Sequence, residues 1–419
     1  LKSVGCVRLD TTAKTSFHLK MMLKSQNMFF VLLIFLVILY ILFVHVSLDG
    51  YFPFKSEFHM NWIKSKVNKN NTIKQRTRID YEKGHRDLCK NSWQENYTKL
   101  HHDMIETNQN KFILFKCARV GWGNRIRDLL SLFHFSVVTK RVFIIDCDVP
   151  SPLDKYLAPR NIKWNIKINE TQLSVRRAYT IKLMKFKRPL NQNAFDDLLK
   201  YSVEDTPTLS GADRHPLFWG SGIRYDLPFG LSYPQMMGCS FYYLFKKSNM
   251  LQKRLDEWRG KLGFNENIVI GIHIREGDFH FHNKRDKRLE MKEIPFSFDC
   301  AAQIQMKVER KYNTKEVIWF LAADSETMKK YAKEKYGNKV RYIDGPIEHV
   351  AHPTKGNEDA GHFSMFLDYF LLQESDYRLY TGPSTFDKAV DFITLGTENV
   401  GSSFYKDARV CVMPPSLIK

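Results

Sequence analysis

A long apolar run near the N-terminus places the strongest constraint on how this chain folds. Residues 28–44 are seventeen consecutive apolar residues, and only His45 and Ser47 interrupt the stretch before Leu48. At about 1.5 Å per residue, a helix over residues 28–48 spans roughly 31 Å, which is the thickness of the hydrocarbon core of a bilayer. The flank after Leu48 offers no small-residue cleavage site, which argues against a removable signal peptide. We therefore expect an uncleaved transmembrane signal anchor at 28–48.

The charges on either side of this segment predict its orientation. Five Lys and Arg residues and one Asp precede the apolar run, whereas the flank that follows mixes acidic and basic residues. The positive-inside rule then keeps residues 1–27 in the cytoplasm and the rest of the chain in the lumen. Segment 49–105 is polar and lacks a sustained apolar period, which is typical of a stem. We predict a type II membrane protein whose head begins at residue 106.

Composition and charge narrow the class of this lumenal head. Hydrophobic residues make up 43% and charged residues 26% of the 419 residues, which excludes a disordered or collagen-like chain. The 64 Lys and Arg residues outnumber the 45 Asp and Glu residues and leave a net charge of +19. Such a charge favours an anionic partner. In a lumenal head we expect a phosphorylated or sulfated small molecule or glycan, and no nucleic acid.

Cysteine usage after the apolar run is compatible with an oxidising lumen. Six cysteines lie there, widely spaced and without a C-x-x-C pair, so no zinc site is expected. Three disulfides and buried free thiols both remain open, because spacing does not select a pairing. Sequons at Asn70, Asn96 and Asn169 fit a glycosylated head. The six cysteines are Cys89, Cys117, Cys147, Cys239, Cys300 and Cys411.

From residue 111 onward, short β-rich runs alternate with amphipathic helical stretches, which is typical of α/β folds with parallel sheets. We predict two Rossmann-like lobes, one at 106–260 and one at 261–419, with a ligand cleft between them. We expect the aromatic, Pro- and Gly-rich segment 185–240 to face the substrate. The predicted strands are 111–115, 141–146, 268–274, 317–323, 340–344 and 377–381, and the predicted helices are 124–140, 246–261 and a stretch around 363–371.

The most informative stretch is the end of the strand at 268–274. This strand is continuously apolar and leads into Arg275, Glu276, Gly277 and Asp278. Open α/β sheets bind ligands at the carboxyl ends of their parallel strands. A guanidinium there can hydrogen-bond two phosphate oxygens and stabilise a departing diphosphate. The alternative is a structural ion pair between Arg275 and Asp278 that closes the turn.

The segment His273–Asp278 resembles the H-x-R-x-x-D motif of the α1,2-, α1,6- and protein O-fucosyltransferase superfamily. Three further elements resemble that superfamily in the same chain order. They are the Gly-rich turn that ends at Asn124, the acidic Asp324 after a strand, and the loop Ser384-Thr385-Phe386 after the last strand. The resemblance covers roughly residues 111–395 and implies a GT-B-like fold. It also implies that the lobe at 106–260 is the acceptor side, that the lobe at 261–419 binds the GDP-sugar donor, and that the protein lies in the Golgi membrane.

The resemblance also implies an activity and a set of contacts. The activity is an inverting transfer of fucose from GDP-fucose to a glycan or glycoprotein hydroxyl, without a metal or another cofactor. Arg275 would hold the β-phosphate and assist catalysis. The other implied donor contacts are His273 and Asp324 at the guanine, Ser384, Thr385 and Phe386 around the phosphate, and Gly121, Gly123 and Asn124 across the cleft.

A general base must take the proton from the acceptor hydroxyl, and several side chains after the strand are candidates. Asp278 is our first choice ahead of Glu276, His280 and His282. Many members of the superfamily carry a second Arg where this chain has Glu276, and the change removes a positive charge beside the expected diphosphate. A catalytically inactive glycan- or nucleotide-sugar-binding protein is therefore one alternative, and a Golgi sulfotransferase is another.

Asp146 and Asp148 form a D-x-D at the end of a predicted strand. In the other major glycosyltransferase architecture such a pair holds a divalent cation on a nucleotide diphosphate. Because the pair directly follows the first βαβ helix, we interpret it as a structural strand end and expect no metal.

Overall fold

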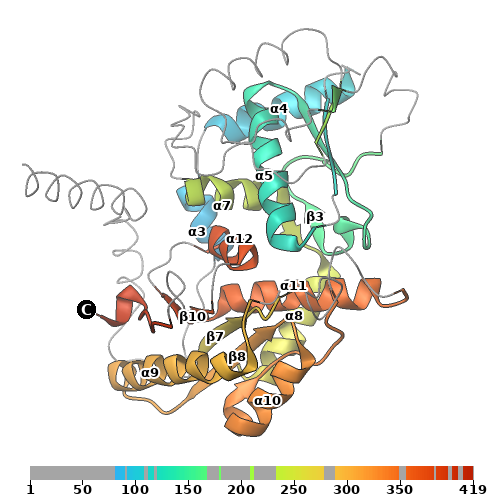
Figure 1. The fold of residues 1–419 in the computed structure, drawn as a ribbon. Coiled ribbons are helices and arrows are strands. Elements are labelled where there is room, and N and C mark those ends of the chain that lie inside the picture. Colours follow the sequence, from blue (N-terminus) through green and yellow to red (C-terminus); the bar gives the residue numbers. More distant parts are fainter. Residues whose placement is uncertain are drawn as a thin grey trace, which may run out of the picture. The chain divides into compact units, whose positions relative to one another are not determined.

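The computed structural model describes most of the chain after residue 80 (Figure 1). All the described residues fall within one compact unit, residues 70–419. The predicted anchor at 28–48 lies outside the described residues, among which no helix is both long and apolar enough to cross a membrane. The described residues are 81–89, 92–107, 112–117, 120–167, 179–180, 208–211, 233–277, 288–348, 355–381, 384–394, 399–403 and 409–418.

A four-stranded parallel sheet lies in the N-terminal half. In spatial order its strands are β2 (Val142–Asp146), β1 (Phe112–Lys116), β5 (Thr208–Gly211) and β4 (Tyr179–Thr180). Helix α5 (Trp122–Val138) connects β1 to β2, and its apolar side chains from Ile126 to Phe135 are buried in the main core. The strands predicted at 111–115 and 141–146 and the helix predicted at 124–140 are confirmed within a few residues.

A five-stranded parallel sheet lies in the C-terminal half. In spatial order its strands are β11 (Val400–Ser402), β10 (Tyr377–Tyr380), β7 (Ile268–Ile274), β8 (Val317–Ala323) and β9 (Val340–Arg341). Strands β7 and β8 have the predicted bounds, and every one of their residues is buried because helices cover both faces. The predicted strand at 340–344 is shorter than expected, since β9 ends at Arg341.

The helices of the C-terminal half divide between the two faces of this sheet. The alternate isoleucines of β7 pack with α9 in one core cluster, whereas Val269 packs with α11 in another. His273 has the same parity as Val269 and therefore lies on the α11 side. The helices are α8 (Asn249–Leu262), α9 (Ile294–Tyr312), α10 (Glu326–Tyr336) and α11 (Glu358–Glu374).

Helix α12 (Thr385–Phe392) joins the two halves (Figure 1). It follows β10 of the second sheet, yet it packs against α5 and against α7 (Tyr233–Leu244) of the N-terminal half. A short antiparallel pair, β3 (Leu157–Pro159) with β6 (Phe245–Lys247), precedes α8. The packing of α12 brings the start of α5 to the carboxyl edge of the second sheet.

The predicted stem is wrong over its last part, because two helices there belong to the head. They are α3 (Tyr81–Leu88) and α4 (Ser92–Glu106). Trp93 and Tyr97 of α4 are buried in the main core, and the Tyr97 hydroxyl donates a 2.7 Å hydrogen bond to the carbonyl of Arg141. Widely spaced aromatic side chains among polar residues form this buried face, which is why no sustained apolar period revealed it.

All six cysteines that follow the predicted anchor form disulfides. Cys89 at the end of α3 bonds to Cys239 in α7, and Cys300 in α9 bonds to Cys411 near the C-terminus. The Cys117–Cys147 disulfide joins the ends of the adjacent strands β1 and β2. Of the two possibilities that the sequence left open, the structure thus shows three disulfides and not free thiols.

Candidate functional site

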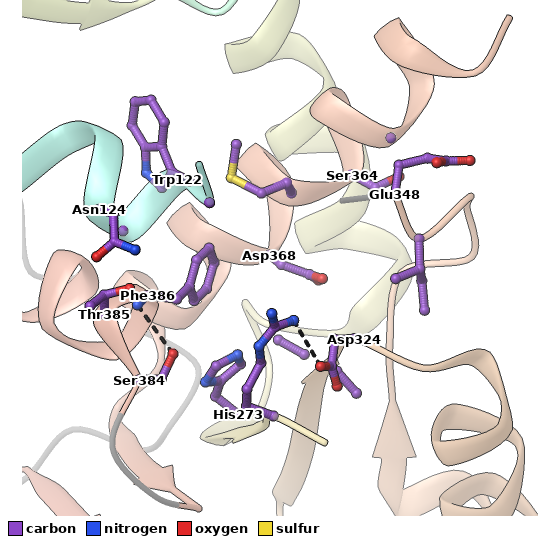
Figure 2. A pocket seen from close by; sticks show the side chains of 18 of the residues that line it. Trp122, Asn124, His273, Asp324, Glu348, Ser364, Asp368, Ser384, Thr385 and Phe386 are labelled. Atoms are coloured by element: carbon purple, nitrogen blue, oxygen red, sulfur yellow. Dashed lines mark hydrogen bonds and ion pairs between the residues drawn. The ribbon is translucent and has the colours of Figure 1, made fainter. Parts of the chain in front are cut away.

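One cavity collects every site residue predicted from the sequence except Asp278, which lies outside the described residues (Figure 2). Its walls are the carboxyl ends of β7 and β8, the first turns of α5 and α12, and one side of α11. The predicted residues that line it are Gly121, Gly123, Asn124, His273, Arg275, Asp324, Ser384, Thr385 and Phe386. The structure therefore places motifs separated by more than 250 residues of sequence around one space.

The Gly-rich turn and the Ser-Thr-Phe loop touch each other at Gly123. A Cβ atom at this position would overlap the backbone carbonyl of Thr385, so only glycine allows α5 to approach α12 this closely. Gly121 is the N-cap of α5, and the Ser384 hydroxyl caps α12 by accepting a 3.2 Å hydrogen bond from the Phe386 N–H. Two helix N-termini thus open on the cavity, where their N–H groups and dipoles favour an anion.

Arg275 is held in place by Asp324. One carboxylate oxygen accepts a 2.8 Å hydrogen bond from the Arg275 guanidinium, and the same carboxylate accepts backbone N–H groups of Glu276 and Gly277 at 2.9 and 3.0 Å. Asp324 is the first residue after β8, so it fastens the end of β8 to the turn that follows β7. This carboxylate orients Arg275, whereas the sequence placed Asp324 at a guanine base.

Glu276 does not belong to the cavity wall. Its side chain is 2% exposed, and it is absent from the residues that line the space. The backbone carbonyl of Glu276 accepts the N–H of Arg288 at 2.7 Å, which ties this turn to the next described segment. The substitution that motivated the inactive alternative therefore does not place a carboxylate against a ligand in the cavity.

His273 forms a buried ion pair with Asp387 of α12. Burial alone lowers the pKa of the imidazole, but the Asp387 carboxylate outweighs burial, so the pKa of His273 is raised. The stabilisation from this pair is complete below the ordinary His pKa and is lost as the pH rises through the raised value. The imidazole also lies 5.0 Å from the Phe386 ring, centroid to centroid. The pair anchors the first turn of α12 to the end of β7.

Asp368 of α11 is a site residue that the sequence reasoning missed. Figure 2 shows its carboxylate projecting from α11 into the cavity, between Ser364 and His273. Its buried Oδ1 has no hydrogen-bond partner among the described residues. Burial raises the pKa of Asp368 to about 6, against the opposing charges of Lys329 and His273. The available signal was a single acidic residue in the helical run 363–372, whose other residues are apolar or aromatic apart from Ser364.

The D-x-D pair takes no part in this cavity. Asp146 and Asp148 are exposed and do not line it, and Asp146 forms a 3.7 Å ion pair with Lys116 at the surface. Cys147 between them is fixed in the disulfide with Cys117. Among the described residues, the one group of possible metal ligands is the exposed trio His102, Asp103 and Glu106 on α4.

Comparison of the sequence with known proteins finds no matching family model and no matching curated protein. Comparison of the structure does find similar proteins. Arabidopsis thaliana FUT1, solved as the R284K mutant in complex with GDP, is 13% identical with a TM-score of 0.53, and the match covers 81% of this chain and 83% of that chain. The chain therefore has the α/β fold of this GDP-bound protein.

Two further solved structures are fucosyltransferases or carry GDP-fucose. NodZ alpha-1,6-fucosyltransferase from Bradyrhizobium, soaked with GDP-fucose, is 15% identical with a TM-score of 0.45, and the match covers 72% of this chain and 98% of that chain. POFUT1 in complex with GDP-fucose is 12% identical with a TM-score of 0.39, and the match covers 72% of this chain and 99% of that chain.

Proposed function

We propose that this chain belongs to the fucosyltransferase superfamily and transfers fucose from GDP-fucose to a hydroxyl of a glycan or glycoprotein. The observation that carries the proposal is the convergence of its separate motifs on one cavity. That cavity lies in a fold shared with a protein solved in complex with GDP. The substrate assignment rests on the chemistry of the cavity walls.

Part of the cavity wall suits a diphosphate. Arg275 presents a guanidinium whose orientation Asp324 fixes, and the N-termini of α5 and α12 add backbone N–H groups and the positive ends of their dipoles. These groups are fixed before substrate arrives, so they stabilise the negative charge that builds up on a departing GDP. They supply the positive charge that a divalent cation provides in other enzymes, and we propose that the reaction needs no metal.

Another part of the cavity wall suits a guanine base. Asp368 offers carboxylate oxygens to the N1–H and N2–H groups of guanine, which are two adjacent donors. His273 lines the same cavity. In this proposal Asp368 takes the base-reading role that the sequence assigned to Asp324, and His273 keeps its place beside the nucleotide.

The reaction is a direct displacement at fucose C1, which inverts the configuration there. The acceptor oxygen forms the new bond to C1 while the bond to the β-phosphate oxygen breaks, and GDP leaves with the electron pair. Arg275 offsets the charge on the leaving group. Asp278, three residues after Arg275 in the sequence, remains our candidate for the base that takes the acceptor proton.

We further propose that the apolar segment 28–48 anchors the chain as a type II protein of the Golgi membrane, with segment 49–80 as the stem. Supporting this compartment, the three disulfides of the head need an oxidising environment to form and persist.

Release of GDP from GDP-fucose tests the proposed activity, measured on the full-length chain in detergent with EDTA and a panel of glycan acceptors. We expect turnover in EDTA and a loss of about 100-fold in Arg275→Ala, the scale of a transition-state charge contact. Arg254→Ala on the exposed side of α8 is the matched control and keeps full activity. Binding of GDP-fucose without any turnover would favour the inactive alternative.

A further inference from the structure

A second charged side chain, Lys329, faces the cavity beside Asp368. Lys329 lies on α10, is 4% exposed and lines the same cavity. Its ammonium donates a 3.1 Å hydrogen bond to the carbonyl of Ile343 and lies 5.7 Å from the centre of the Tyr342 ring. A buried ammonium is costly unless its three N–H donors find acceptors. Within the described part of the chain, the Ile343 carbonyl is the one acceptor that it has.

Lys329 and Asp368 have opposite charges, yet no ion pair joins them among the described residues. The charge of Lys329 nevertheless acts on Asp368, because it opposes the effect of burial on the pKa of that carboxyl. Both groups therefore line one cavity with unused hydrogen-bonding capacity. Ile347 and Met365 line the same cavity and offer apolar surface to a flat ring.

The hydrogen-bonding edge of guanine matches this pair. Guanine presents two adjacent donors, the N2 amino group and N1–H, followed by the acceptor O6. A carboxylate accepts from both donors, and an ammonium donates to O6. Adenine and cytosine each present one donor beside one acceptor, and uracil presents a single donor, so none of them fills both oxygens of a carboxylate.

We propose that Lys329 is a specificity-determining residue that donates a hydrogen bond to O6 of guanine while Asp368 accepts from N1 and N2. This inference rests on the proposed function, because it names how the donor site selects its nucleotide. Lys329 thereby excludes nucleotides that present a donor or a hydrogen at the O6 position, such as ADP.

Calorimetric titration of the full-length chain in detergent tests the contact with three nucleotides. They are GDP, IDP, which lacks the N2 amino group, and 2-aminopurine riboside 5′-diphosphate, which lacks both O6 and the N1–H donor. The variant is Lys329→Met. The matched control is Lys333→Met, one turn along α10, whose exposed ammonium also bonds a backbone carbonyl, that of Val340, and does not line the cavity.

We expect Lys329→Met to lower the affinities for GDP and for IDP by about tenfold each, which is the scale of one charge-assisted hydrogen bond. The same variant should change the affinity for the 2-aminopurine nucleotide by less than twofold, since that base has no O6 to lose. Lys333→Met should leave all three affinities unchanged. Lys329→Gln, which keeps a donor for Ile343, serves in the same titrations if the Met variant does not fold.

Equal losses for all three nucleotides would overturn the inference, because they would mean that Lys329 only supports the Ile343 carbonyl. Unchanged GDP affinity in both Lys329 variants would overturn it as well. Failure of the proposed function gives a different result, since the wild-type chain would then bind GDP no better than ADP or UDP.

Discussion

Two carboxylates that line one cavity have different tasks in this protein, and their hydrogen bonds distinguish them. Asp324 accepts three hydrogen bonds from the turn after β7, whereas Asp368 has no partner for its buried oxygen in the described structure. A carboxylate that is already saturated positions other groups, and an unpaired one is available to a ligand. Asp324 therefore positions the site, and Asp368 is available to recognise a ligand.

The task of Asp324 can be tested through its dependence on Arg275. We expect Asp324→Asn to weaken GDP binding by about tenfold, because the neutral amide no longer fixes the guanidinium. In an Arg275→Ala background, the same substitution should weaken GDP binding little further, because the guanidinium that Asp324 orients is absent. Titration of GDP into the four proteins of this cycle measures the coupling, and fully additive losses would contradict it.

Recognition by Asp368 predicts a pH dependence of substrate binding. The pKa of this carboxyl is raised to about 6 by burial, and only the ionised form accepts both guanine donors. GDP-fucose affinity should therefore fall about tenfold between pH 7.5 and pH 5. GDP-fucose is the suitable ligand because it has no terminal phosphate that titrates near pH 6. The Asp368→Asn variant should bind GDP-fucose weakly, with an affinity that does not change over this pH range. If its affinity still depends on pH, another group is responsible for the titration.

The same raised pKa predicts that Asp368 lowers the stability of the fold. The folded carboxyl keeps its proton up to about pH 6, whereas the unfolded chain loses it near the ordinary value of 3.8. Folding stability attributable to this group thus decreases as the pH rises from 4 to 6 and stays low above. Asp368→Asn should therefore unfold at a higher temperature than wild type at pH 7.5, with a smaller difference at pH 4, as measured by thermal melts. A lower melting temperature at pH 7.5 would contradict this.

Among the secondary-structure elements, the contact between α5 and α12 shapes the site most directly. Gly123→Ala should destabilise the head by about 1–3 kcal/mol and weaken GDP binding, because the added methyl overlaps the Thr385 backbone and separates the two N-termini. Gly260→Ala in α8 is the control, since no atom lies within 4 Å of its added Cβ and alanine favours the helix. Denaturant unfolding of both variants checks the difference, and equal stabilities would contradict it.

One disulfide should stabilise the fold without affecting nucleotide binding. Cys89–Cys239 spans 150 residues of sequence and holds α3 on α7, away from the cavity lining. Replacing both cysteines by serine should cost about 3–5 kcal/mol of unfolding free energy, the range for closing a long loop. GDP affinity of the folded variant should stay within twofold of wild type in a titration. A loss of affinity would show that α3 and α4 influence the site from a distance.

Across the whole molecule, local rules predicted four of the five strands of the second sheet, whereas most of the residues that line the cavity were expected from the resemblance to a superfamily. Continuously apolar runs mark β7 and β8 as buried parallel strands, and side chains that follow such strands gather at one edge. The close approach of Gly123 to the Thr385 backbone has no such local signal, because it depends on the packing of α12 against α5 of the N-terminal half.

The remaining features needed the folded structure for the same physical reason. The Cys89–Cys239 pairing and the burial of Trp93 and Tyr97 are set by contacts between segments far apart in sequence. Lys329 and Asp368 lie 39 positions apart on two helices. In the sequence, each by itself is typical of an ordinary helical residue. Their relation to one cavity is visible only once α10 and α11 flank β8.

The measurement that tests the central claim most directly is a calorimetric titration of the full-length chain with GDP-fucose, GDP, UDP and ADP in EDTA. The account predicts that GDP and GDP-fucose bind, and that UDP and ADP bind at least tenfold more weakly. It also predicts that Arg275→Ala weakens the binding free energy of GDP by about 2 kcal/mol. The same variant should bind guanosine, which lacks phosphates, as well as wild type does. A folded chain that binds none of these nucleotides, or binds all four alike, would contradict the account.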